Sequence, residues 1–263
     1  MFRSTLIAAA AALLLGAAPT MAKTLTAGAN IGNVPWEFQD QNGDTVGFEV
    51  DLLKEVANRL GYDKVDIQNI PFNGLFSAVQ SGRIDVAISS ITITDERLKS
   101  VSFAQPYYDS DQSLSTKTDS GIKSTKDLKG KVVGVDTGST GDMYATQRKD
   151  EWGLSDIRRY EGLNPAMLDL AAGRIDAYVS DIPAVAYYLK DKPQMKVVER
   201  LKTGEQYSMM FAKDSPLALK VNDVLTTLKK EGFIANLHKK WFGSMPEDTT
   251  SSVAVMDMPK PKS

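Results

Sequence analysis

The tetrapeptide Gly82-Arg83-Ile84-Asp85 occurs a second time in the chain, as Gly173-Arg174-Ile175-Asp176. A helical pattern precedes each copy, and a short apolar strand and a polar loop follow it. When the copies are aligned on their glycines, Ser89-Ser90-Ile91 falls on Ser180-Asp181-Ile182. A repeat with matching flanks indicates two similar structural units. The sequence therefore predicts two similar lobes.

Predicted strands and helices alternate around the repeat. Residues 24–29 and 65–70 are short apolar runs of the kind that form strands. Between them, Phe48, Leu52 and Val56 recur every four residues, which predicts an amphipathic helix over 49–60. Because alternating strands and helices are typical of α/β layers, we expect an α/β fold with mainly parallel sheets.

The chain is expected to cross between the lobes twice. Residues 23–110 together with 205–243 would form lobe 1, and residues 111–204 would form lobe 2. Two hinge strands, near Ser110 and Gly204, would join the lobes, with a ligand cleft between them. Residues 244–263 are rich in Ser, Thr, Pro and Lys, a composition that predicts a flexible tail.

Composition excludes several functional classes. The 263 residues carry a net charge of −2, no cysteine and one histidine. A disulfide scaffold, a thiol nucleophile and a Cys/His zinc site are therefore excluded. Since no block of basic residues stands out, nothing points to a nucleic-acid partner. We expect neither a cofactor nor a metal ion.

Residues 1–22 have the features of a cleaved signal peptide. Arg3 precedes an apolar run over 6–18, and Thr20 and Ala22 are small residues suited to a cleavage site. The run is too short for a membrane-spanning helix, which needs about 20 residues. Because no cysteine follows the site, a lipid anchor is not expected. We predict a periplasmic protein that does not span the membrane.

The loops that follow the predicted strands hold most of the candidate binding groups. Ligands of open α/β sheets bind at the carboxyl ends of strands, and clefts between domains are preferred sites. The loops supply hydroxyls, amides, glycine N–H groups and two aspartates, a mixture that suits a small zwitterion such as an amino acid. The residues expected to bind it are Asn30, Asn33, Phe72, Ser90, Thr92, Arg97, Asp136, Thr140, Ser180 and Asp181.

The two charges of a free amino acid require different partners. Arg97 can bind the carboxylate with two parallel hydrogen bonds, and the N–H group of Thr140 lies where a predicted helix starts. Asp181 can pair with the ammonium, and the Thr92 hydroxyl and the Ser90 carbonyl can complete its shell. A purely structural role is the alternative for each of them, such as a solvated helix start at Arg97 or a helix cap at Asp181.

Several motifs resemble those of one known family. The segment Gly47-Phe48-Glu49-Val50-Asp51-Leu52 resembles the signature of the periplasmic polar-amino-acid-binding proteins of ABC transporters, solute-binding protein family 3. Residues 89–97 and 103–108 are similar to the carboxylate-binding segment and first hinge of that family. Residues 131–140 and 174–181 are similar to its second-lobe pattern. The resemblance covers residues 23–243.

The resemblance implies the type II periplasmic-binding-protein fold, in which two lobes close on a ligand. It also implies delivery of a free polar amino acid to an ABC permease in the inner membrane, by a monomer that is not an enzyme. Phe72 matches one of two aromatic residues that clamp the ligand side chain. The residues that match those holding the amino-acid backbone are Ser90, Thr92, Arg97, Thr140 and Asp181.

Three positions depart from the family pattern. Asn33 replaces the second clamp aromatic, Asn30 replaces a frequent aspartate, and Asp136 stands where glutamine-binding members carry lysine. Because Asp136 would repel a second carboxylate, we expect glutamine-like or basic amino acids to bind more tightly than glutamate or aspartate. The alternative is that Asp136 is a turn residue that points into lobe 2.

Two enzyme classes share features with this sequence. Ser120-Gly121-Ile122-Lys123 and Lys202-Thr203-Gly204 fit the S-x-x-K and K-T-G motifs of β-lactamases and penicillin-binding proteins, but Ser180-Asp181 is followed by isoleucine instead of asparagine. A cyclohexadienyl dehydratase also resembles the family. Its chemistry needs a general acid, for which Asp136 or Asp181 would have to serve.

Overall fold

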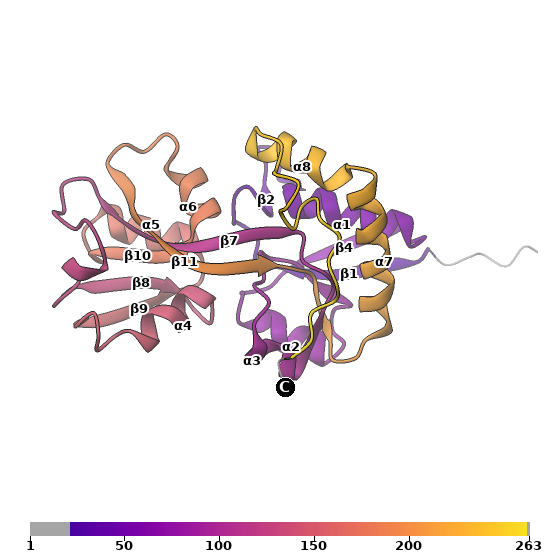
Figure 1. Ribbon diagram of the computed structural model, residues 1–263, viewed down its shortest axis with the longest axis horizontal. Helices are drawn as coiled ribbons and strands as arrows, with labels where there is room; N and C mark the ends of the chain where they lie inside the picture. The colour runs from indigo at the N-terminus through magenta and orange to yellow at the C-terminus, as the bar shows by residue number, and fades with distance from the viewer. Residues whose placement is uncertain (1–21, 262–263) are drawn as a thin grey trace, which may run out of the picture.

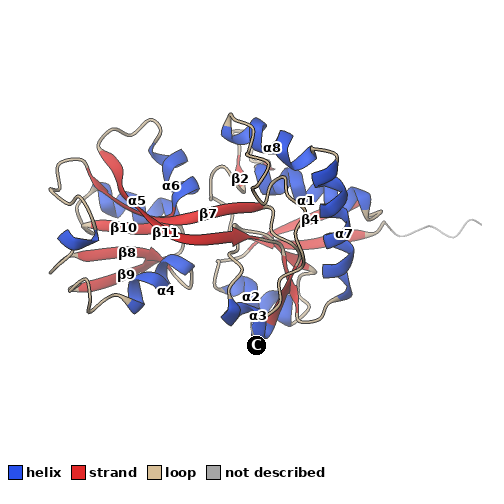
Figure 2. Ribbon diagram, in the orientation of Figure 1, coloured by secondary structure: helices blue, strands red, loops and turns tan. Residues whose placement is uncertain are grey.

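The structure of the chain is a computed structural model that describes residues 22–261, so the predicted signal peptide lies outside the described residues except for Ala22. Two lobes lie side by side along the long axis of the molecule, and each is built on a five-stranded sheet (Figures 1 and 2). No helix in the described part of the chain combines the length and apolar character needed to cross a membrane.

Lobe 1 contains a sheet with the strand order β4-β1-β5-β12-β6. Its strands are β1 (Thr24–Ala29), β4 (Lys64–Asn69), β5 (Val86–Ala87), β6 (Val101–Phe103) and β12 (Met210–Ala212), and a small ribbon pairs β2 (Phe38–Gln39) with β3 (Thr45–Val46). Its helices are α1 (Phe48–Arg59), α2 (Gly74–Gln80), α3 (Asp95–Ser100), α7 (Pro216–Lys230) and α8 (Phe233–Phe242).

Lobe 2 contains a sheet with the strand order β11-β7-β10-β8-β9. Its strands are β7 (Tyr108–Lys117), β8 (Val132–Asp136), β9 (Asp156–Tyr160), β10 (Ala177–Asp181) and β11 (Met195–Tyr207). Its helices are α4 (Thr140–Gln147), α5 (Leu163–Ala171), α6 (Ile182–Leu189) and a short 3₁₀ turn, η1 (Thr125–Asp127).

Both sheets are mixed rather than mainly parallel. In lobe 1, β1 pairs in parallel with β4 and β5, whereas β12 is antiparallel to β5 and β6. In lobe 2, β8 pairs in parallel with β9 and β10, whereas β7 is antiparallel to β10 and β11. The parallel strands come from the β-α-β units that the sequence predicts. The antiparallel strands follow from the two crossings of the chain between the lobes.

The aspartate of the repeated tetrapeptide joins two strands in each lobe. Asp85 accepts a hydrogen bond from the Thr26 N–H at 2.8 Å, and Asp176 accepts one from the Val132 N–H at 2.8 Å. These bonds tie the beginning of β5 to β1, and the beginning of β10 to β8. The sequence repeat therefore has the same structural role in both lobes.

The isoleucine of the tetrapeptide lies against a glycine of the neighbouring strand. A Cβ atom added to Gly28 would lie 2.5 Å from Ile84 Cδ1, and one added to Gly134 would lie 2.5 Å from Ile175 Cδ1. Larger residues at these glycines would force the isoleucines out of their positions in the core.

Buried aromatic rings attach both hinge strands to the core of lobe 1. Trp36 is fully buried, and its ring packs edge-on against Tyr108 at 4.6 Å and Tyr207 at 5.4 Å between ring centroids. Tyr108 begins β7 and Tyr207 ends β11, and the two residues are register partners. Their rings are also stacked on each other at 5.8 Å. This packing positions the lobe 1 ends of both strands.

The pairing of β7 with β11 is irregular where the chain crosses between the lobes. Ser110 pairs with Glu205, but the register shifts between Leu201 and Glu205. Asp111 stabilises this bulge, because its Oδ1 accepts hydrogen bonds of 2.7 Å from the N–H groups of Thr203 and Gly204. The irregularity coincides with the predicted hinge position.

The C-terminal segment, residues 244–261, differs from the flexible tail predicted for it. Ser252 is buried and donates to the Tyr107 carbonyl at 2.9 Å, and the Ser251 N–H donates to Asp109 at 2.7 Å. Lys229 donates to the Ala254 carbonyl at 2.9 Å. Figure 1 shows the segment in yellow, running from α8 across lobe 1 past the ends of β7 and β11. Composition could not predict this, since the polar side chains bond to specific groups of lobe 1.

Removing the C-terminal segment should destabilise lobe 1. For a chain from Lys23 that ends at Gly243, we expect the free energy of unfolding to fall by about 2–4 kcal/mol, because several buried hydrogen bonds lose a partner. Thermal and urea denaturation measure the change. A chain that lacks only residues 260–263 is the control and should match the longer protein. Equal stability of all three chains would show that the segment contributes nothing.

Candidate functional site

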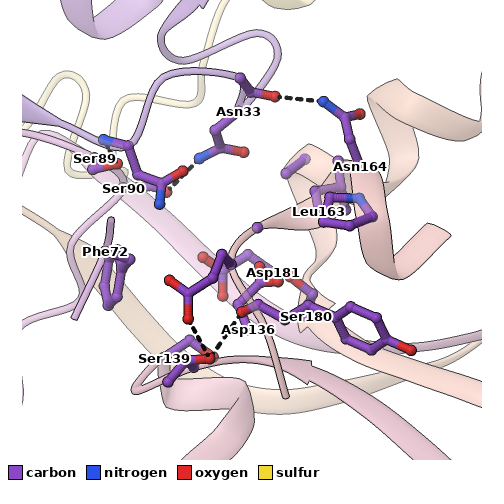
Figure 3. Close-up of a pocket in the computed structure, with 18 of the residues that line it drawn as sticks. Asn33, Phe72, Ser89, Ser90, Asp136, Ser139, Leu163, Asn164, Ser180 and Asp181 are labelled. Atoms are coloured by element: carbon purple, nitrogen blue, oxygen red, sulfur yellow. Dashed lines mark hydrogen bonds between the residues drawn. The ribbon is translucent and has the colours of Figure 1, made fainter. Parts of the chain in front are cut away.

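A cleft of about 160 Å³ lies between the two lobes (Figure 3). It lies near the carboxyl ends of β1 and β5 in lobe 1 and of β8, β9 and β10 in lobe 2. All but one of the residues predicted for the site line it. They are Asn30, Asn33, Phe72, Ser90, Thr92, Asp136, Thr140, Ser180 and Asp181.

Arg97 is the predicted residue that does not line the cleft. It is buried beside it at the start of α3, where its Nη1 donates to the Thr92 carbonyl at 2.7 Å and its Nη2 donates to the Gly138 carbonyl at 3.2 Å. Burial lowers the pKa of Arg97 to about 10, although the charges of Glu205 and Asp181 raise it. The guanidinium therefore stays protonated at neutral pH and places a positive charge behind the cleft.

The turn between β9 and α5 forms a wall of the cleft that the sequence pattern does not predict. Tyr160, Glu161 and residues 162–165 line the cleft there. The reason lies in β9, the strand before this turn. Its sequence, Asp-Ile-Arg-Arg-Tyr, lacks the apolar run that identifies a strand such as β1. A polar edge strand exposes one face to water, and hydrophobic pattern alone does not identify it.

Hydrogen bonds between described residues join the lobes across the cleft. Asn164 donates to the Gly32 carbonyl at 3.3 Å, as Figure 3 shows. Arg97 reaches Gly138 from lobe 1, and the hydroxyls of Thr92 and Thr140 lie 3.5 Å apart. The lobes are therefore closed on each other in this arrangement.

Ser90 adopts an uncommon backbone conformation at the edge of the cleft. Its φ of 44° lies in the left-handed region, which costs a residue other than glycine about 1–3 kcal/mol. The carboxylate of Glu49 accepts the Ser90 N–H at 2.8 Å and 3.0 Å. Tyr107 also donates to Glu49. This buried carboxylate holds the loop that carries Ser89 and Ser90 in its strained shape.

A second buried carboxyl group supports Glu49. Glu37 is fully buried, and its Oε1 accepts a hydrogen bond from Ser89 at 2.6 Å. Burial and the neighbouring charge of Glu49 raise the pKa of Glu37 well above its usual value. The other oxygen, Oε2, has no further partner among the described residues. A proton on Oε2 would satisfy that oxygen and reduce the repulsion between the two buried carboxyl groups.

The cleft is acidic. Asp136, Glu161 and Asp181 line it, and no lysine or arginine is found among its described lining residues. Burial raises the pKa of Asp136 to about 7, and Asp136 Oδ1 has no hydrogen-bond partner in the described part of the chain. Asp181 occupies the position before α6 without capping it, and its side chain accepts from Gln112 instead. The electrostatics favour a ligand that carries positive charge.

The serine motif of the β-lactamase alternative does not form an active site of that kind. Ser120 lies in an exposed turn after β7, not at the head of a buried helix. Its hydroxyl accepts hydrogen bonds from Thr116 and from the Ile122 N–H. In the other motif, Thr203 accepts the Gln112 N–H within the hinge.

Comparison with known proteins agrees with this geometry. Residues 25–244 match the bacterial extracellular solute-binding proteins, family 3. The chain belongs to this family. Arginine-binding extracellular protein ArtP of Bacillus subtilis (strain 168) is 36% identical to this family 3 protein over 224 residues, which cover 84% of this chain and 86% of ArtP.

Solved structures similar to this family 3 protein are also binding proteins. The arginine-, lysine-, histidine-binding protein ArtJ from the thermophilic bacterium Geobacillus stearothermophilus has a TM-score of 0.80 at 35% identity, with 86% of this chain and 98% of that chain covered. An ancestral arginine-binding protein was solved with arginine and with glutamine. Both structures have a TM-score of 0.79, at 38% and 37% identity, and cover 85% and 86% of this chain and all of that chain.

The raised pKa of Glu37 should appear in the pH dependence of stability. Because the pKa of Glu37 is higher in the folded protein than its value of 4.5 in a model compound, the folded state binds more protons above that pH. Its contribution to stability is therefore present at low pH and is lost as pH rises. We expect the stability of the natural protein relative to Glu37→Gln to fall as pH rises above about 4.5.

Urea denaturation at several pH values measures this difference. Glu151→Gln, at an exposed glutamate, is the matched control and should show a much smaller pH-dependent difference from the natural protein. A constant difference between the natural protein and Glu37→Gln across the range would mean that Glu37 does not hold a proton in the folded state.

Proposed function

We propose that this protein binds a free amino acid with a basic or amide side chain in the interlobe cleft and delivers it to an ABC permease in the inner membrane, without catalysing a reaction. The observation that carries the proposal is the acidic cleft, which both lobes line with hydrogen-bonding groups. The family membership and the amino-acid ligands named for the relatives support it.

The backbone of the amino acid would bind between the lobes. We assign its ammonium group to Asp181, the Thr92 hydroxyl and the Ser90 carbonyl, since all three are hydrogen-bond acceptors. We assign its carboxylate to the N-terminus of α4 at Thr140, with Arg97 supplying the positive charge. Arg97 now donates to two backbone carbonyls, and a guanidinium has further N–H groups that a carboxylate can use.

The side chain of the amino acid would lie against Phe72 and point toward Asp136 and Glu161. Asp136 is the last residue of β8, and Asn30 follows the end of β1, the strand that corresponds to β8 in lobe 1. A guanidinium or ammonium group there would pair with a buried carboxylate, whereas a carboxylate would meet like charge. The amide of glutamine would form hydrogen bonds without a charge penalty.

The location and mode of action follow from the same proposal. We propose that residues 1–22 are removed as a signal peptide and that the mature protein acts as a monomer in the periplasm. Lobe 1, residues 23–110 and 205–243, and lobe 2, residues 111–204, would rotate about the hinge near Ser110 and Gly204. The C-terminal segment would move with lobe 1, because its hydrogen bonds are to groups in residues 105–109 and to Gln206 and Lys229.

Ligand preference tests the function directly. In titration calorimetry we expect arginine and glutamine to bind, and glutamate and aspartate to bind at least about tenfold more weakly, because Asp136 repels a second carboxylate. Asp136→Asn should weaken arginine about tenfold and leave glutamine within about threefold. Since ionised Asp136 attracts a cation, arginine affinity should rise between about pH 6 and pH 8, and rise less in the variant.

Asp150→Asn, at an exposed aspartate of lobe 2, is the matched control for this series and should bind like the natural protein. Glutamate or aspartate as the tightest ligand would overturn the assignment of Asp136 to the side-chain pocket. An absence of binding by any common amino acid in a thermal-shift screen would overturn the proposed function itself.

Lobe movement gives a second test. The hydrogen bonds of Asn164 and Arg97 across the cleft involve exposed or partly buried groups, so we expect a ligand-free population with open lobes and a shift to the closed form on binding. Small-angle scattering should give a smaller radius of gyration with saturating arginine than without it. Glutamate at the same concentration serves as the control and should change the profile little. Identical profiles with and without bound arginine would contradict hinge closure.

A further inference from the structure

Glu205 lies at the hinge, immediately behind the cleft, and contacts both lobes. It is 7% exposed and belongs to β11. Its Oε2 accepts a hydrogen bond from the Thr92 hydroxyl of lobe 1 at 2.9 Å and from the Thr140 hydroxyl of lobe 2 at 3.0 Å. Neither the sequence repeat nor the family motifs identified this residue.

These hydrogen bonds determine what the two threonines offer to a ligand. A hydroxyl has one proton to donate and two lone pairs that can accept. Because Thr92 and Thr140 both give their proton to Glu205, their remaining capacity toward the cleft is that of acceptors. Acceptors bind an ammonium group and do not bind a carboxylate.

Glu205 is also close to the carboxylate of Asp181. The side-chain amide of Gln112 donates to Asp181 and to Glu205, at 3.0 Å from Glu205 Oε1. The two acidic side chains come from different elements, β10 and β11, and meet around one neutral amide. Two buried carboxylates are costly to keep ionised together unless a cation pairs with them.

The groups that face this pair do not neutralise it. Arg97, from α3, acts on both charges, but its hydrogen bonds go to the carbonyls of Thr92 and Gly138. Asp136, from β8, adds negative charge, and Tyr207 and Tyr178, from β11 and β10, add none. No ion pair to Glu205 or Asp181 occurs among the described residues. Burial, and next the charge of Glu205, raise the pKa of Asp181 well above its usual range.

We propose that Glu205 and Asp181 form a two-carboxylate receptor for the ligand's ammonium group, and that the pair holds one proton in the empty site and releases it to solvent when the ammonium enters. Glu205 acts as a positioning residue through Thr92 and Thr140, and Asp181 faces the cleft. The charges balance, because the bound ammonium takes the place of the lost proton. This inference rests on the proposed function, and it identifies the hinge as part of the specificity for α-amino groups.

Proton release can be counted by titration calorimetry with arginine in buffers of different ionisation enthalpy at neutral pH. The natural protein should release more protons for each bound arginine than Glu205→Gln, by a substantial fraction of one proton. Removing the charge of Glu205 removes the second of the causes that raise the pKa of Asp181, so the empty site of the variant holds less of the proton. Arginine should also bind about tenfold more weakly to the variant. Any proton released by Asp136 is common to both proteins and cancels in the difference.

The matched control is Glu199→Gln, at another glutamate of β11. Glu199 accepts the Thr125 N–H away from the cleft, so this variant should behave like the natural protein.

If Glu205→Gln does not fold, Asp136→Asn replaces it in the proton count. Proton release that persists in Asp136→Asn supports the receptor, and its disappearance overturns it. The receptor would also be overturned if Glu205→Gln released as many protons as the natural protein and bound arginine with an affinity within about threefold of it. No melting shift of the natural protein with arginine or glutamine would contradict the proposed function before any proton is counted.

Discussion

The antiparallel pairing of β7 with β11 is the constraint on which the cleft depends. The chain passes between the lobes on these two strands, and Trp36 packs against the ends of both in lobe 1. The bulge held by Asp111 is confined to the crossing. Because the strands are paired on either side of it, the lobes keep their facing surfaces. The polar loops can therefore meet across a narrow gap.

Buried carboxyl groups then give the cleft its shape and its charge. Glu37 and Glu49 are both buried below the loop of Ser90, and the hydrogen bonds from the Ser90 N–H to Glu49 stabilise a left-handed backbone that serine would not adopt alone. Behind the cleft, Glu205 and Asp181 meet around Gln112. The physical principle is the same in both places. A carboxylate removed from water needs donors or a cation, and hydrogen-bond donors of the protein face the buried carboxyl groups in both places.

The C-terminal segment shows why composition is a weak guide to packing. Its serines, threonines and prolines are typical of a loose tail, yet Ser251 and Ser252 are buried against residues 107–109. Short hydroxyl side chains satisfy backbone groups that a sheet or helix would otherwise pair. Whether a polar segment does so depends on the surface it meets, and no local pattern carries that information.

The sequence by itself determined the two-lobed α/β architecture, because the repeated tetrapeptide makes the same hydrogen bond and the same isoleucine–glycine contact in each lobe. It also determined which strand-end loops face the cleft, since parallel strands bring their carboxyl ends to one edge of a sheet. Only the tertiary structure decided that Arg97 turns to two carbonyls, that Glu161 joins the cleft wall, and that Glu205 meets Asp181. Those outcomes depend on distances between residues far apart in the chain, which neither periodicity nor local motifs encode.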